Sequence, residues 1–476
     1  MNRASSEAPL TPVAVDDLRQ QVVGVGQQVP LRDGSMRPYV NFDNAASTPA
    51  FRYVRDQVVD FLEWYSSVHR GAGYKSLVST QAYDKAHEMV GDFVGADPDT
   101  DCVIFGKNTT EAVNILVSSV NLSPEDVVIT TALEHHSNDL PWRPGATVAY
   151  AMPNEDGTIS LETLAELLDR YADRVKLVAT TGASNVTGFL PPIYDMAALA
   201  HDHGAKIFVD CAQLAPHRAI DMGAPGSRNR LDFVAISGHK MYAPFGTGAL
   251  IGAREDFAEG APAQRGGGTI EIVTLDEVHW AAPPGRYEAG SPNVVGAVAL
   301  AASIQVLSAT GMDRIAAHEK ELTSYAVRRM VELDGVTLHG SRDPDRVEDR
   351  LGVVPFTVDG VSHGKVAAIL SMEGAIGVRN GCFCAHPYVL QLLGISGPEY
   401  HAYKERVLSG DRSTLPGLVR VSFGCYNTRE EIDWLVEMLE RITAGDYQDD
   451  YVVDASSGEH FPSEFDTSIV EESFRI

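Results

Sequence analysis

The stretch LDFVAISGHKMYAPFGTGALIG, residues 231–252, constrains the fold of this chain more than any other segment. Two apolar runs, 233–236 and 248–251, are separated by a loop that contains proline and glycine. This pattern predicts two strands joined by a tight turn, with Lys240 fixed directly after the first strand. Burial lowers the pKa of a lysine and makes its amine nucleophilic, so the segment indicates a reactive lysine.

An aspartate precedes this lysine at the end of another strand-like run. The segment AKIFVDCAQ, residues 205–213, has an apolar core that ends in Asp210. Pyridoxal phosphate needs a lysine for its attachment and an anion that keeps its ring nitrogen protonated. Asp210 and Lys240 together therefore predict a pyridoxal phosphate site. For the SGHK segment alone, a solvated loop lysine is the open alternative.

The two segments together resemble a known family. VDCAQ followed by SGHKMYAPFGTGAL resembles the fold-type I pyridoxal phosphate enzymes of the class V aminotransferase group, in particular the group II cysteine desulfurase and selenocysteine lyase branch. The resemblance runs from about residue 41 to about residue 442. It implies an α/β fold, with a large domain on a mostly parallel sheet of the seven-stranded type and a smaller α+β C-terminal domain.

Strands that alternate with helices, and polar residues at the strands' carboxyl ends, favour a mostly parallel sheet with the site along one edge. We expect an N-terminal arm (1–40), a large pyridoxal phosphate-binding domain (41–293), a small C-terminal domain that takes in part of the N-terminal segment (294–445), and an acidic tail (446–476). Docking and disorder both stay open for the tail.

Composition excludes several classes of partner. With 65 acidic against 38 basic residues the net charge is −27, which argues against binding to nucleic acid or an anionic membrane. Five cysteines, an odd and sparse set, indicate free thiols in a reducing compartment. The sequence contains no apolar run that approaches a membrane span, so we expect a cytoplasmic protein.

Polar residues after the strands are candidates for binding the coenzyme. The segment GKNTTEA, residues 106–112, follows a strand and opens a helix, whose free N–H groups and positive dipole end suit a phosphate. Thr109 and Thr110 add hydroxyls there, with simple N-caps as the alternative. Asn185 follows another strand and can donate to the phenolic oxygen of the coenzyme. The other candidates at strand ends are Gln213, Ser237 and His239.

The resemblance assigns roles to two further segments. The segment LEHHSN, residues 133–138, resembles the EHH turn of group II desulfurases, in which the first histidine, here His135, stacks on the pyridoxal ring and moves protons. The segment RYEAGSPN resembles the RFEAGTPN turn, whose hydroxyl residue, here Ser291, reaches the phosphate of the neighbouring subunit in a homodimer. The adjacent histidines lack further ligands at usable spacing, so we expect no metal.

A loop with two thiols, VRNGCFCAHP at residues 378–387, is the second informative stretch. Thiols one residue apart do not easily share a disulfide or a tetrahedral metal site, and their spacing suits one facing the site and one facing away. Two buried small hydrophobes are the alternative. The loop resembles RTGHHCA of group II desulfurases and the CFC loop of molybdenum-cofactor sulfurases, and in both the aligned thiol is Cys384. Cys382 and Asn380 depart from the group II pattern.

The segment VRVSF, residues 419–423, supplies an arginine for substrate capture. A buried arginine grips a carboxylate with two parallel hydrogen bonds, and the family places one shortly before a turn like CYNT. We assign Arg420 first and Arg379 as its neighbour, with Asn185 beside them. A surface ion pair is the alternative for Arg420.

The leading hypothesis is a cysteine desulfurase that takes sulfur from L-cysteine, releases L-alanine and leaves a persulfide on Cys384 for an acceptor protein. The alternative is an enzyme of the same fold, such as an aminotransferase, an epimerase or a C–S lyase acting on a cysteine conjugate, in which Cys384 is not essential. A third class is a non-catalytic sulfur-transfer partner. The presence of Lys240, Asp210, His135 and Gln213 together argues against that class.

Overall fold

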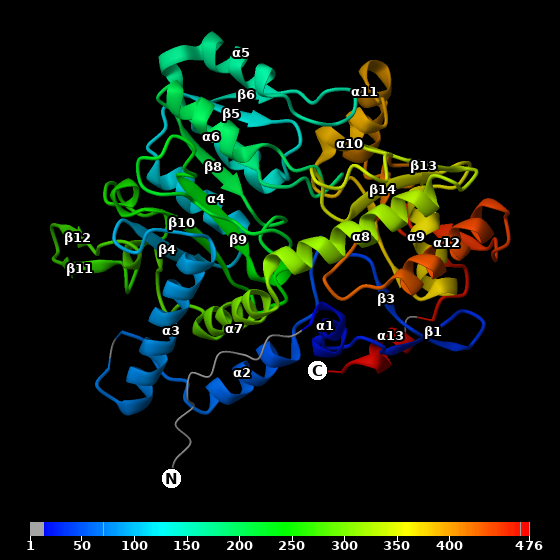
Figure 1. Cartoon of the computed structure of the whole chain (residues 1–476), viewed down its shortest axis with the longest axis horizontal. Coiled ribbons are helices and arrows are strands. Elements are labelled where there is room, and N and C mark those ends of the chain that lie inside the picture. Colours follow the sequence, from blue (N-terminus) through cyan, green and yellow to red (C-terminus); the bar gives the residue numbers. More distant parts are fainter. Residues whose placement is uncertain (1–13, 70, 467, 476) are drawn as a thin grey trace.

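The computed structural model describes residues 14–69, 71–466 and 468–475 and divides into two packed units (Figure 1). The larger unit holds a seven-stranded sheet in the order β4-β10-β9-β8-β7-β5-β6. Its strands are β4 (Asp101–Gly106), β5 (Val127–Thr131), β6 (Thr147–Ala151), β7 (Val175–Thr181), β8 (Lys206–Asp210), β9 (Phe233–Ser237) and β10 (Gly248–Ala253).

Only β10 runs against its neighbours, and every other pair in this sheet is parallel. Because β10 is antiparallel to both β4 and β9, those two strands share one direction, and the carboxyl ends of β4, β5, β7, β8 and β9 meet at one edge. The predicted α/β fold with a mostly parallel seven-stranded sheet is confirmed. The strands read as apolar runs because helices cover both faces.

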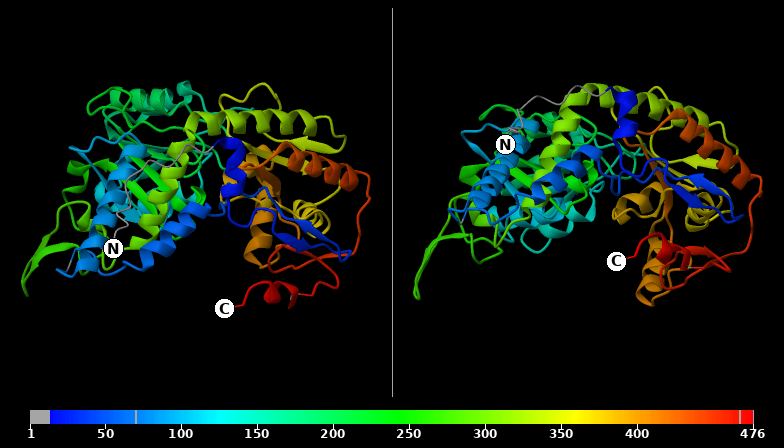
Figure 2. Two further views of the ribbon diagram at one scale, coloured as in Figure 1. Left: turned by 60° about the horizontal axis from the view of Figure 1, so that its bottom comes forward. Right: turned by 90° about the horizontal axis from the view of Figure 1, so that it is seen from below.

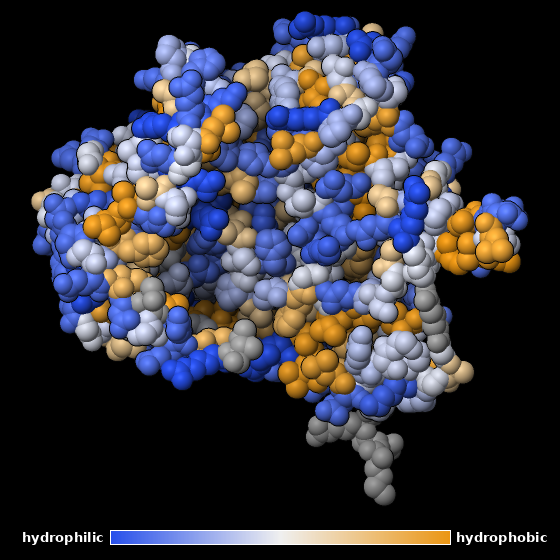
Figure 3. Space-filling view, turned by 180° about the vertical axis from the view of Figure 1, so that it is seen from behind, coloured by the Kyte–Doolittle hydropathy of each residue, from blue (hydrophilic) through white to orange (hydrophobic). Residues whose placement is uncertain are grey.

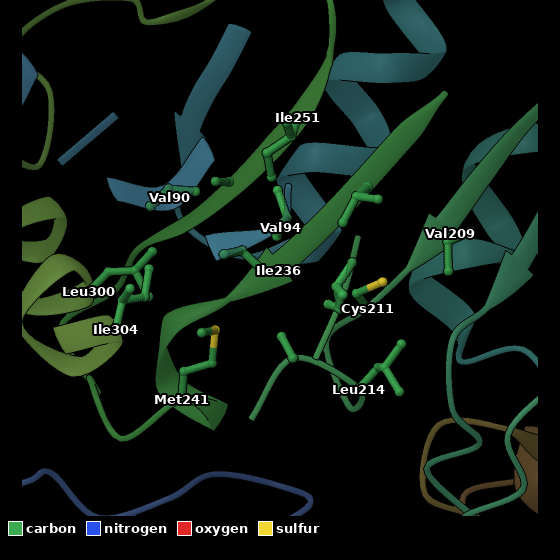
Figure 4. Packing of buried hydrophobic residues seen from close by; sticks show 14 of the residues in the cluster. Val90, Val94, Val209, Cys211, Leu214, Ile236, Met241, Ile251, Leu300 and Ile304 are labelled. Atoms are coloured by element: carbon green, nitrogen blue, oxygen red, sulfur yellow. The ribbon is translucent and has the colours of Figure 1, made fainter. Parts of the chain in front are cut away.

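The two faces of the sheet pack against different helices. Val234 and Ile236 of β9 lie in the cluster that contains α3 (Tyr74–Phe93) and α7 (Val294–Thr310), as Figure 4 illustrates for Ile236. Phe233 and Ala235 point the other way, into the cluster that contains α4 (Thr109–Ser119). Side chains of a strand alternate between faces, so one apolar run fills both cores. The other helices of this unit are α2 (Arg52–Leu62), α5 (Leu161–Tyr171) and α6 (Ile193–Asp202).

The smaller unit is built on an antiparallel sheet in the order β13-β14-β17-β16. Its strands are β13 (Val336–Leu338), β14 (Val353–Val358), β16 (Arg379–Gly381) and β17 (Leu418–Ser422), and its helices include α8 (Met312–Met330), α9 (His363–Gly374) and α12 (Arg429–Thr443). Near the N-terminus, β3 (Val40–Asn41) pairs with β15 (Ile376–Gly377), which ties the early chain to this unit. The four predicted domain bounds stay predictions, and residues 1–13 of the N-terminal arm lie outside the described residues.

The remaining elements lie at the periphery. They are α1 (Val15–Gln21), the hairpin β1 (Gln28–Pro30)–β2 (Met36–Pro38), α10 (His386–Leu392), α11 (Gly397–Leu408), the hairpin β11 (Ile270–Val273)–β12 (Val278–Trp280), the hairpin β18 (Tyr451–Val453)–β19 (His460–Pro462) and α13 (Ser468–Ser473). The β11–β12 hairpin extends away from the body (Figure 2) and exposes apolar side chains at its end (Figure 3).

The acidic tail docks on the smaller unit, which resolves the choice that its sequence left open. Tyr451 donates to Glu373 on α9 at 2.9 Å, and Lys365 and Arg32 pair with Asp449 and Asp450. Within the described residues no single helix is long and apolar enough to cross a membrane, although α7 and α8, bent by 77°, meet that length and composition as a pair.

Candidate active site

A cavity of about 270 Å³ opens at the edge where the parallel strands end. It brings together every predicted site residue except Ser291, which is exposed and lies outside the cavity. The predicted residues that line it are Thr109, Thr110, His135, Asn185, Asp210, Gln213, Ser237, His239, Lys240, Arg379, Cys384 and Arg420. A predicted set drawn from seven different segments therefore converges on one concave site, as expected of a small-molecule site in an α/β sheet.

Lys240 and Asp210 form the electrostatic centre of this cavity. Lys240 ends the short 3-10 helix Gly238–Lys240 that follows β9. Burial lowers the pKa of its amine to about 8, against the opposing effect of the Asp210 carboxylate. Asp210 ends β8, where burial raises its pKa and the charge of Lys240 lowers it. One oxygen of Asp210 accepts the Ala212 N–H at 2.9 Å, which fixes the carboxylate towards the cavity.

The N-terminus of α4 forms an anion cradle on one wall. Asn108 caps the helix by accepting the Glu111 N–H, and the Thr109 N–H donates to the Ser237 hydroxyl at 3.1 Å. The buried hydroxyl of Thr109 has no hydrogen-bond partner among the described residues, although a buried polar atom normally has one. Asn108 rather than a threonine is therefore the N-cap, and the hydroxyl is free to donate to an anion held by the helix dipole.

His135 lies beside this cradle, directly before the short 3-10 helix His136–Asn138, whose Ser137 hydroxyl is 2.6 Å from the Thr110 hydroxyl. Its Nδ1 accepts the Ser137 N–H at 3.1 Å, so we assign the ring proton to Nε2. Burial and the nearby charge of Lys240 lower the pKa of His135 to about 3. The residue presents a neutral imidazole at neutral pH rather than a cation.

Glu134 was not predicted as a site residue, yet it holds this wall in place. It is buried and accepts hydrogen bonds from Thr131 at 2.6 Å, Asn138 at 2.7 Å and the Thr181 N–H at 3.0 Å. These donors come from the ends of β5 and β7 and from the turn after His135, so the carboxyl group fixes their relative positions. The signal in the sequence was a charged residue in the turn that follows the apolar strand β5.

Arg420 is a buried residue of β17, 2% exposed. Its guanidinium donates to the Asn185 carbonyl at 2.9 Å and to the Asp43 carboxylate at 2.8 Å, while its Nε has no partner among the described residues. The surface ion pair considered for Arg420 is therefore wrong. Arg379 is exposed and stands 4.0 Å from the other oxygen of Asp43. Asp43 was missed because its partner lies far away in the sequence.

Two side-chain amides in the cavity bind protein carbonyls. The Asn185 amide donates to the Phe383 carbonyl at 2.8 Å, and the Gln213 amide donates to the Ala45 carbonyl at 2.7 Å. Asn185 thus links the cavity to the two-thiol loop, a contact that the sequence did not predict. Each amide group carries a second hydrogen, and both residues line the cavity.

The two thiols of the loop face different surroundings. Cys384 is exposed and lines the cavity, whereas Cys382 is half-buried and donates to the Pro416 carbonyl at 3.4 Å. Burial raises the pKa of Cys382 to about 11. This is the arrangement that the spacing favoured, with one thiol facing the site and one facing away. Within the described residues no three His, Cys, Asp or Glu side chains gather as ligands for a metal ion.

Comparison with known proteins places the chain in a family. The family described as Aminotransferase class-V matches residues 40–435. The cysteine desulfurase of Haloferax volcanii is 34% identical over 445 residues, 90% of this chain and 97% of the relative. The apo cysteine desulfurase of Thermococcus onnurineus has a TM-score of 0.77 at 30% identity, over 90% of this chain and 98% of that one. An S-sulfonic acid form of a cysteine desulfurase from Escherichia coli has a TM-score of 0.74 at 27% identity, over 92% and 100%.

The fold and the site define a pyridoxal phosphate-dependent enzyme. The chain belongs to the class-V aminotransferase family, and its relatives include cysteine desulfurases. Pyridoxal 5'-phosphate is its cofactor, as in the other members of these families. The residues present fit this group: the unpartnered Thr109 hydroxyl at the start of α4 suits the phosphate, Asp210 suits the ring nitrogen, and the Lys240 amine suits the aldehyde.

Proposed function

We propose that the chain is a cysteine desulfurase that converts L-cysteine to L-alanine and holds the removed sulfur as a persulfide on Cys384. The observation that carries the proposal is that an exposed thiol, Cys384, lines the same cavity as Lys240 and Asp210. The names of the relatives give it further support. Any other member of the fold can use the lysine and the aspartate, but only sulfur transfer needs a thiol facing them.

In this proposal the start of α4 would hold the phosphate of the cofactor. The Thr109 hydroxyl, the helix dipole and the Ser237 hydroxyl, which already accepts the Thr109 N–H, bind it. Asp210 would hold the proton on the ring nitrogen of the bound group, and the neutral His135 imidazole would provide the aromatic surface against its ring. Gln213 and His239 complete the cofactor wall as further lining residues. Bound pyridoxal phosphate supplies the electron sink for bond breaking at the amino acid's α-carbon.

Arg420 binds the carboxylate of the substrate, and Arg379 adds positive charge at the cavity mouth. The unpartnered Nε of Arg420 gives the guanidinium a free donor for this purpose. Lys240 moves protons at the α-carbon, and its pKa of about 8 suits a group that both takes and returns a proton near neutral pH. Asn185 holds the reactive loop through the Phe383 carbonyl while these steps proceed.

The sulfur step uses the Cys384 thiolate as nucleophile. It attacks the sulfur of the substrate, the bond between that sulfur and the β-carbon breaks, and the electron pair of this bond stays with the carbon fragment, which takes protons and leaves as alanine. A sulfur–sulfur bond remains on Cys384. The positively charged side chains of Arg379, Arg420 and Lys240 line the same cavity as Cys384.

We further propose a homodimer, a sulfur-acceptor protein and a cytoplasmic location. Ser291 is exposed beside the β11–β12 hairpin, where Ile272, Val273 and Leu275 are more than half exposed, which supports burial of this region against a second copy. The exposed position of Cys384 supports transfer of its sulfur to another protein. Five free thiols support a reducing compartment.

Turnover with L-cysteine tests the proposal. Pyridoxal phosphate-loaded wild-type protein is expected to release alanine, and Cys384→Ala to lose that activity while it retains the visible absorbance of the cofactor. Full activity in Cys384→Ala would instead establish a lyase that needs no persulfide. No alanine from loaded wild-type protein would exclude free cysteine as substrate and favour a cysteine conjugate or another amino acid.

A further inference from the structure

The two-thiol loop adopts a conformation that its own residues do not favour. Phe383 and Cys384 have φ angles of 52° and 56°, in the left-handed region that side chains with a Cβ rarely occupy. Cys384 is also exposed, so burial of its side chain does not stabilise the loop. Contacts from neighbouring elements must therefore hold Cys384 towards the cavity.

His136 supplies such contacts at Cys384 and two residues further on, at His386. Its backbone N–H donates to the Cys384 carbonyl at 2.8 Å. Its ring Nε2 lies 3.4 Å from the backbone N of His386 and 3.1 Å from the Nδ1 of that residue. The two imidazole rings stack with centroids 4.9 Å apart and planes 10° apart. His136, in the turn after β5, thus contacts the residues on both sides of Ala385, which are Cys384 and His386.

The hydrogen bonds fix the protonation of both rings. A backbone N–H can only donate, so Nε2 of His136 is an acceptor and carries no proton. Nδ1 of His386 faces the same atom and must therefore carry a proton. Burial and the charge of His386 lower the pKa of His136, and burial lowers that of His386, so the neutral pair persists at neutral pH.

We propose that His136 and His386, here called the imidazole pair, are positioning residues that hold the Cys384 thiol in reach of the substrate sulfur. This inference rests on the proposed desulfurase function. The pair does not touch the reacting atoms: neither residue lines the cavity, while Cys384 does. Its loss should therefore slow sulfur transfer without weakening capture of the substrate, which depends on Arg420.

Three variants of His386 separate the stacking of its ring from the hydrogen bond that its Nδ1 makes to His136. His386→Ala removes both, His386→Phe keeps the stacked ring, and His386→Gln keeps an N–H donor. We expect kcat to fall roughly tenfold or more in His386→Ala, since misplaced reacting groups cost that much, while KM for L-cysteine stays within about twofold. Stacking alone should not hold the loop, so His386→Phe should resemble His386→Ala and His386→Gln should recover most of the activity.

Gln391→Ala is the matched control on α10. Gln391 is exposed and reaches across to the Pro153 carbonyl at 3.4 Å, so it also links α10 to the larger unit without touching the pair. Its kcat should equal that of wild type. Cofactor absorbance and the melting temperature of each variant establish that the protein is folded and loaded.

A double-mutant cycle and hydrogen exchange complete the test. If His136 and His386 act as one unit, His136→Ala, His386→Ala and the double variant lose similar activity, and amide exchange in residues 379–392 rises in all three. Unchanged kcat and unchanged exchange in His386→Ala, or fully additive losses in the cycle, would overturn the inference. If wild-type protein makes no alanine, the proposed function fails, whereas the exchange of the loop still decides the role of the pair.

Discussion

Replacing Arg420 by glutamine tests the substrate site most informatively. Arg420 is buried on β17, and its guanidinium is held by the Asn185 carbonyl and the Asp43 carboxylate, with Nε left without a partner among the described residues. In the proposed function the Arg420 guanidinium binds the substrate carboxylate through its unpartnered Nε–H and an adjacent N–H of the same group. Glutamine is shorter and uncharged, so it cannot make this pair of bonds.

The magnitude follows from the bonds that are lost. Two charge-assisted hydrogen bonds of about 1.5 kcal/mol each amount to about 3 kcal/mol. Since about 1.4 kcal/mol corresponds to a factor of ten, kcat/KM for L-cysteine should fall roughly 150-fold, mostly through a higher KM. The unfolding free energy should also fall by about 1–3 kcal/mol, because Asp43 loses its buried partner.

Steady-state kinetics with L-cysteine measure this effect, and Arg379→Gln is the matched control. Arg379 is exposed and stands 4.0 Å from Asp43, so its loss should change KM no more than about fivefold. The reasoning is refuted if Arg420→Gln keeps the wild-type KM while Arg379→Gln raises it, because the carboxylate would then bind at the cavity mouth rather than at Arg420.

Three further predictions concern the cofactor site and the body of the protein. Thr109→Ala should weaken pyridoxal phosphate binding roughly tenfold, since one hydrogen bond to an anion is lost, and Thr109→Ser should not; equal affinities in an absorbance titration would contradict the phosphate cradle. Burial lowers the pKa of Lys240 from 10.5 to about 8. The folded cofactor-free protein should therefore bear a penalty of up to about 3 kcal/mol below pH 8, which fades as pH rises to 10.5 because the unfolded chain binds the additional proton in that window. Denaturation of cofactor-free Lys240→Met and wild type should differ accordingly at pH 7 and converge at high pH, and a gap independent of pH would refute this. Buried Glu319 pairs with Arg218 and accepts the Gly352 N–H at 2.7 Å, so Glu319→Gln should lower the unfolding free energy by about 3 kcal/mol, and an unchanged urea midpoint would count against that role.

The sequence predicted the sheet and most of the cavity for one physical reason. Strands buried on both faces read as apolar runs, and parallel strands bring the residues after their carboxyl ends to one edge. Lys240, Asp210, Asn185 and His135 all follow such runs, so their convergence could be read from order and pattern alone.

Contacts between segments that lie far apart in the sequence could not be predicted in this way. Asp43 meets Arg420 across 377 residues, and no local pattern marks either as the partner of the other. His386 meets His136 across 250 residues for the same reason. No buried apolar pattern marks the β11–β12 hairpin after residue 269, because its apolar side chains are exposed rather than buried.

The mass of the two-thiol peptide after one turnover tests the central claim most directly. Loaded protein is given one equivalent of L-cysteine without reductant, alkylated and digested, and the position of the added sulfur is read by fragmentation. Cys382 and Cys384 share one tryptic peptide, residues 380–404, so Cys382→Ser and Cys384→Ala are run in parallel. We predict one extra sulfur on Cys384 in wild type and in Cys382→Ser, and none in Cys384→Ala. Sulfur on Cys382, or alanine released with Cys384 unmodified, would contradict the account.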